Sequence, residues 1–240
     1  MLEMTIHFKT DPSNSTNPYH PILHLQIMSV LFIPPSTGCG PEGKGTDANG
    51  FLILYILRNG RRIGRGMIGK EIGLGEGSTR RLIDMMSSLD LLKVEQTGVT
   101  ITKYGKALLD RLAIEIVHPR TDRYVLGTST CGALIRGKGP SVTNGTAQRN
   151  TAIRVGGEGC TTWFMRDGEI IMAPDWNVDS KDPSFGIELR RTTGMSEGDA
   201  LVIAGADTPE KARDVAVSVA LGMIRRPSPH PRKPSSSPHP

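Results

Sequence analysis

The side chains best suited to recognition chemistry are two adjacent arginines, Arg80 and Arg81, near the start of residues 76–89. A guanidinium group can donate paired hydrogen bonds to base edges and to phosphate oxygens. Alone, such a pair is more typical of a solvated helix face. In this segment, however, apolar residues recur with helical spacing, at Leu82, Met85, Met86 and Leu89. We therefore expect a helix that buries this stripe and turns the arginines outward.

The flanking residues predict the rest of a winged helix-turn-helix. Residues 66–72 read as a short helix, and Gly73-Leu74-Gly75 as the turn before the arginine-bearing helix. After that helix, residues 92–96 and 99–102 alternate apolar and polar side chains across Thr97-Gly98, which is typical of a hairpin. The hairpin would be the wing.

Two further helices complete the expected unit. Residues 47–59 carry an apolar run that could also be a buried strand, but its position before the turn favours a helix capped by Asp47. Thr102 should cap a closing helix that runs as far as Ile116. In this unit we expect double-stranded DNA to be contacted by Ser78, Arg80, Arg81, Asp84, Lys93 and Arg65.

Charge is distributed in agreement with that expectation. Residues 58–111 hold eleven Lys/Arg against six Asp/Glu, whereas residues 120–224 hold twelve against thirteen. A basic unit joined to a nearly neutral one is the expected electrostatic pattern of a nucleic-acid-binding domain with a partner domain.

Catalytic and metal-binding patterns are not evident in the sequence. The three cysteines lack metal-ligand spacing and suit reduced thiols, and His118 is the only histidine in residues 50–224. Gly64, Gly66 and Gly69 match a dinucleotide fingerprint, but the preceding turn is too long and basic. We therefore expect no enzyme activity, no cofactor and no metal.

Several of these residues resemble a known family. The segment from Lys70 to Arg80, Ile63-Gly-Arg65 and Thr100-Ile-Thr102 are similar to an archaeal family of uncharacterised winged-helix proteins. The DNA-binding domain of that family resembles the N-terminal domain of the central glycolytic genes repressor. The resemblance, which spans about residues 47–224, implies a transcription regulator in which Arg80 is the recognition-helix arginine. Asn150 stands where the family usually has an acidic residue.

The second half predicts a compact α+β domain. Residues 124–129 and 131–135 suit strands, 161–166 and 169–173 a hairpin over Asp167-Gly168, and 201–204 a short buried strand. Helices are expected over residues 146–155, 182–191 and after Thr208, the last with a small-residue face. In this domain, a small molecule could be bound by Arg149, Asn150, Gly157 and Thr161.

These expectations give an α+β chain of four parts. Residues 1–46 should be poorly ordered, 47–118 form the winged helix, 119–224 form a ligand-binding or dimerisation domain, and 225–240 form a disordered basic tail. The apolar run at residues 22–33 is too short to cross a membrane, and we expect a cytoplasmic protein.

We expect a transcriptional regulator that reads the major groove and whose second domain senses a small-molecule effector or forms a homodimer. Two alternatives stay open. One is an enzyme that binds a small molecule and carries the winged helix as a docking module, and the other is a pure protein-interaction module.

Overall fold

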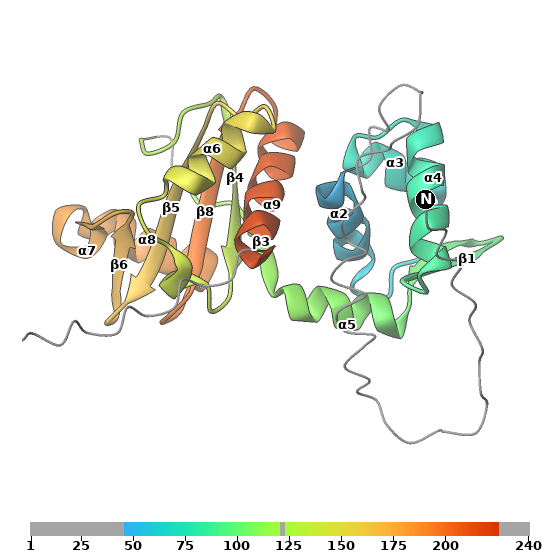
Figure 1. The fold of residues 1–240 in the computed structure, drawn as a ribbon, viewed down its shortest axis with the longest axis horizontal. Helices are drawn as coiled ribbons and strands as arrows, with labels where there is room; N and C mark the ends of the chain where they lie inside the picture. The colour runs from blue at the N-terminus through green and yellow to red at the C-terminus, as the bar shows by residue number, and fades with distance from the viewer. Residues whose placement is uncertain (1–45, 121–122, 226–240) are drawn as a thin grey trace, which may run out of the picture.

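The computed structural model describes residues 46–120 and 123–225. They form a helical unit with a two-stranded hairpin, followed by a unit built on a six-stranded sheet (Figure 1). The predicted α+β class, with a winged helix-turn-helix before a small α+β domain, is confirmed. The predictions for residues 1–45 and 226–240 lie outside the described residues.

The N-terminal unit has the expected order of elements. A capping box at Thr46, and not Asp47, begins the first helix, in which the Thr46 hydroxyl accepts from the Asn49 N–H. Strands β1 and β2 pair antiparallel, and an isolated bridge between Ile63 and Val99 adds a third short segment to the wing. The elements are α2 (Asp47–Leu57), α3 (Arg65–Ile72), α4 (Glu76–Ser88), β1 (Leu92–Glu95), β2 (Gly98–Ile101) and α5 (Lys103–Leu112).

The C-terminal unit is an antiparallel sheet in the order β3-β4-β8-β5-β6-β7. Its central strand, β8, is buried throughout, which agrees with its run of small and aliphatic residues. The strands are β3 (Ile114–Val117), β4 (Ser129–Ile135), β5 (Gly159–Arg166), β6 (Glu169–Met172), β7 (Trp176–Asn177) and β8 (Ala200–Ala206).

Helices cover both faces of this sheet. On one face, α9 (Pro209–Arg225) packs against β4 and β8 through its small-residue side, and α6 (Thr146–Arg154) lies beside it. On the other face, Phe185 and Leu189 of α8 (Pro183–Thr193) form a core with inward side chains of β4, β5 and β8, namely Leu134, Trp163, Met165, Leu201 and Ile203. A short helix α7 (Val178–Lys181) and a 3-10 turn η1 (Gly139–Ser141) complete the unit.

Two sequence predictions are wrong. The helix expected to reach Ile116 ends at Leu112, because Ala113 adopts a left-handed conformation with φ 49° and β3 then pairs with β4. Consequently, Ile114–Val117, which we expected to continue the last helix of the N-terminal unit, forms a strand of the C-terminal sheet. The strand expected at residues 124–129 does not form. There, Gly127 has φ 130°, and Tyr124 packs its ring on Trp163 and Phe185.

The two units meet between α2 and α9. The Ile116 N–H donates to the Tyr55 hydroxyl at 3.1 Å, and Arg213 Nη1 donates to the Glu71 carbonyl at 3.1 Å. Arg225 forms an ion pair with Asp47 at the start of α2. These contacts connect the sheet-bearing unit to both α2 and the end of α3. Within the described residues, no helix is long and apolar enough to cross a membrane.

Candidate nucleic-acid interface

Helix α4 is held against α3 by a close approach at Gly69. A Cβ on Gly69 would lie 2.7 Å from Thr79 Oγ1 and 2.9 Å from the Leu74 carbonyl oxygen. The Thr79 hydroxyl donates within the turn, to the Gly75 carbonyl at 3.0 Å. Gly73 ends α3 in a left-handed conformation with φ 70°, which favours glycine. The turn between the two helices therefore fixes the direction in which α4 leaves α3.

The inner face of α4 is formed by Thr79, Leu82, Ile83 and Met86, all at most 4% exposed. Met85 and Leu89, which we expected to belong to the buried stripe, are only partly buried at its edge. Arg80 and Arg81 are exposed, and neither side chain has an ion-pair or hydrogen-bond partner among residues 46–120 and 123–225. The arginines are thus available to an external anion or base edge.

The wing carries its own small charge network. Lys93 Nζ lies 2.6 Å from Glu95 Oε1, and Arg62 also pairs with Glu95 and donates to Thr97. Hydrogen bonds from Lys93 and then Arg62 hold the pKa of Glu95 below its usual value. Lys93 is exposed as a phosphate contact requires, but Glu95 partly neutralises it. Arg62, which the sequence analysis did not select, belongs to the same surface, as the Ile63–Val99 bridge indicates.

The remaining predicted contacts lie on α3 and α4. Asp84 is exposed on α4, and Ser78 is half-buried in its first turn. Arg65 is the first residue of α3 and is exposed. The six predicted side chains therefore come from α3, α4 and β1, three elements of the N-terminal unit (Figure 1).

The four residues predicted to bind a small molecule do not form one site. Arg149 and Asn150 are exposed on α6. Thr161 projects from the opposite face of the sheet, where its hydroxyl donates to the Tyr124 carbonyl at 2.6 Å. Gly157 closes the end of α6, because its N–H donates to the Ala152 carbonyl at 2.9 Å and a Cβ would lie 2.8 Å from Val215.

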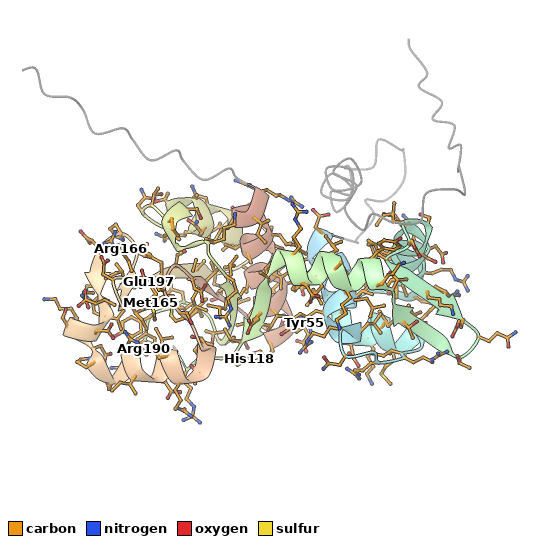
Figure 2. All side chains as sticks on the ribbon, turned by 90° about the horizontal axis from the view of Figure 1, so that it is seen from below. Tyr55, His118, Met165, Arg166, Arg190 and Glu197 are labelled. Carbon is orange, nitrogen blue, oxygen red and sulfur yellow. The ribbon has the colours of Figure 1, made fainter. Side chains whose placement is uncertain are left out.

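Other polar clusters serve the fold. Arg190 forms two short hydrogen bonds with Asp179, and the Glu197 carboxylate accepts from the N–H groups of Asp167 and Gly168. Figure 2 shows Arg166, Arg190 and Glu197 in the part of the C-terminal unit far from the winged helix, and His118 near the junction. In the described part of the chain, His118 is the only histidine and has no hydrogen-bond partner, so a histidine-activated nucleophile does not form there.

Comparison with known proteins divides the chain at the same junction. Residues 48–116 match the family described as the CggR N-terminal DNA binding domain, and residues 126–224 match a domain of unknown function, DUF4443. A solved structure, hypothetical protein PH0730 from Pyrococcus horikoshii OT3, shares the fold. It has a TM-score of 0.58 and 24% sequence identity over 76% of this chain and 94% of that one. No protein of curated function matches the chain. Each family match thus covers less than half of the chain, and the two together show that the winged-helix segment is similar to the CggR N-terminal DNA binding domain and the sheet-bearing segment to DUF4443.

Proposed function

We propose that this chain is a DNA-binding regulator in which α4 enters the major groove. The observation that carries the proposal is the pair Arg80 and Arg81, which are exposed on a helix whose opposite face is buried. Neither arginine forms an ion pair with a residue that the structure describes. Guanidinium groups in this position can donate to guanine or to phosphate, and Asp84 on the same helix can accept from cytosine. The match of residues 48–116 to a DNA-binding domain family supports the same conclusion.

The wing supplies backbone contacts in this proposal. Lys93 and Arg62 present positive charge beside α4, and such groups position a protein on the duplex without reading its sequence. In this proposal, Arg65 at the start of α3 and Ser78 at the start of α4 donate hydrogen bonds to phosphates. We therefore expect base readout by α4 and phosphate contacts from its surroundings.

A salt titration of the full chain tests the electrostatic part. Affinity for a random-sequence duplex should fall steeply with salt, since each neutralised phosphate adds roughly one unit to the log–log slope. The double variant Lys93→Ala/Arg65→Ala should reduce that slope by about one to two units. Arg166→Ala, which removes a cation far from the winged helix, is the control and should leave the slope unchanged. A wild-type chain that binds no duplex at low salt would contradict the proposal and favour a protein-interaction role.

The C-terminal unit is proposed to sense an effector or to form a homodimer. A palindromic operator requires two copies of α4 related by a two-fold axis. Sedimentation analysis with and without a selected operator would show whether the chain pairs alone, pairs on DNA, or binds as a monomer. Monomeric binding to an isolated half-site would remove dimerisation from the proposal.

A further inference from the structure

A cleft of about 620 Å³ lies where the two units meet. One wall is the start of α2 together with Gly73 and Leu74 of the turn before α4, and the other wall comes from α6 and α9. Its volume lies in the range of sites that hold small metabolites. None of the ligand-binding residues predicted from the sequence lines it.

The lining of this cleft carries an excess of positive charge. Its two acidic residues both have basic partners: Asp47 pairs with Arg225, and Asp214 lies 3.6 Å from the guanidinium of Arg213. Burial, opposed by Arg213, raises the pKa of Asp214. A raised pKa favours the neutral form of this carboxyl and so reduces the negative charge of the cleft lining.

Two further cations, Arg154 of α6 and Lys211 of α9, line the cleft, and Lys211 acts on Asp214 only through its charge, which opposes the effect of burial on the pKa of that carboxyl. Within residues 46–120 and 123–225, neither side chain has an ion-pair or hydrogen-bond partner. Lys211 is only partly exposed and lies over Gly156, where an added Cβ would be 3.0 Å from Lys211 Nζ. The backbone there, with φ 86°, favours glycine, so the chain leaves room for the lysine beside the cleft.

We propose that this cleft binds a small organic phosphate through Arg154 and Lys211. A phosphate group offers several strong acceptor oxygens, and charge-assisted hydrogen bonds to Arg and Lys are the interactions that recognise it. Hydroxyl groups of Thr151 and Ser218, which already donate to their own helices, can still accept hydrogen bonds from the rest of the ligand.

The site is placed to influence α4. Leu74, which lines the cleft, sits in the turn that fixes the direction of α4, and its N–H donates to the Gly69 carbonyl at 2.9 Å. A ligand that touches this turn and α9 together would favour one arrangement of the two units. Its binding would then be linked to DNA binding, and each ligand would change the affinity of the other by the same factor. This regulatory consequence rests on the proposed function, whereas the binding site itself does not.

Calorimetric titration of the full chain with inorganic pyrophosphate tests the site without DNA. Wild type should bind, and Arg154→Ala/Lys211→Ala should weaken the affinity about tenfold or more, since two charge-assisted contacts are lost. Arg166→Ala should bind as wild type, and circular dichroism should show all three chains folded. The site is refuted if wild type shows no binding up to about 10 mM pyrophosphate or if the double variant binds equally well.

A competition experiment between pyrophosphate and duplex DNA shows whether the cleft binds a small ligand or the phosphates of DNA. A random-sequence duplex that leaves bound pyrophosphate in place supports the small-molecule site. Displacement of pyrophosphate from wild type, together with weaker duplex binding by Arg154→Ala/Lys211→Ala, would instead assign both cations to the DNA-binding surface and overturn the proposal. A chain that binds pyrophosphate but no duplex would retain the site and refute only the proposed regulatory function.

Discussion

Replacing Gly69 with alanine tests the packing that orients α4. The new methyl group would lie 2.7 Å from Thr79 Oγ1 and 2.9 Å from the Leu74 carbonyl oxygen, so α3 and α4 must move apart. Such overpacking costs about 1–3 kcal/mol, and the better helix propensity of alanine returns about 0.5–1 kcal/mol. We expect a net loss of about 1–2 kcal/mol, which lowers the melting temperature by about 2–8 °C in a chain of this size.

Gly66→Ala is the matched control because it makes the same change on the same helix, where nothing lies within 4 Å of the added methyl. It should be neutral or slightly stabilising in thermal and urea unfolding. Thr79→Ala should be less harmful in the Gly69→Ala background than in wild type, because it removes one of the two clashing atoms. Equal stability of Gly69→Ala and Gly66→Ala would refute the close approach of the two helices.

Three other predictions concern charge and burial. Glu95→Gln should strengthen binding to any duplex and steepen its salt dependence, since Lys93 and Arg62 lose their acidic partner; unchanged affinity would exclude the wing from the DNA surface. Burial raises the pKa of Cys131 and of the partly buried Cys160 to about 12. In a Cys39→Ser background, a disulfide reagent at pH 8 should therefore label both thiols far more slowly in the folded than in the unfolded chain. Equally fast labelling of the folded and the unfolded chain would disprove this shielding. Hydrogen bonds from Arg190 and from the Ile170 N–H, opposed by burial, hold the pKa of Asp179 below its usual value. This carboxylate therefore stabilises the fold above about pH 4, and its contribution disappears as pH falls through the lowered pKa. Asp179→Asn should therefore cost about 1–2 kcal/mol near neutral pH and flatten the acid-induced loss of stability seen in urea titrations, and an unchanged acid profile would show that the pair does not contribute.

The winged helix was largely predictable because its signals are local. The pattern of residues 76–89 gave α4 within one residue, and the alternation around Thr97-Gly98 gave both wing strands. Thr102 caps α5 as expected, with its hydroxyl accepting from the Gly105 N–H at 3.1 Å. The inner face of α4 was placed slightly wrongly, since Ile83 is fully buried and Met85 is not. The stripe was assigned from spacing alone, whereas α3 approaches α4 from the side of Thr79 and Ile83.

Long-range contacts could not be read from the sequence. Ile116 follows Leu112 at a spacing of four residues, which fits the continuation of a helix, and only pairing with β4 identifies Ile114–Val117 as a strand. The interdomain cleft is lined by four segments that are far apart in the sequence. Only the α9 residues Lys211, Asp214 and Ser218 share a recognisable pattern, because they recur at helical spacing. The ligand-binding residues predicted from the sequence do not form one site, because side chains alternate between the two faces of a strand. Thr161 of β5 faces the side of the sheet that is opposite to α6, which carries Arg149 and Asn150.

The central claim is that Arg80 and Arg81 read DNA from the outer face of α4. The most direct measurement is the ratio of affinities for an operator, selected from a random duplex pool, and for an unrelated duplex, compared among wild type, Arg80→Ala, Arg81→Ala and the control Arg166→Ala. We predict that losing a base-reading arginine lowers this ratio by about 5- to 150-fold, corresponding to about 1–3 kcal/mol, while Arg166→Ala leaves it unchanged. Wild-type ratios in both α4 variants would contradict the assignment of α4 as the recognition helix.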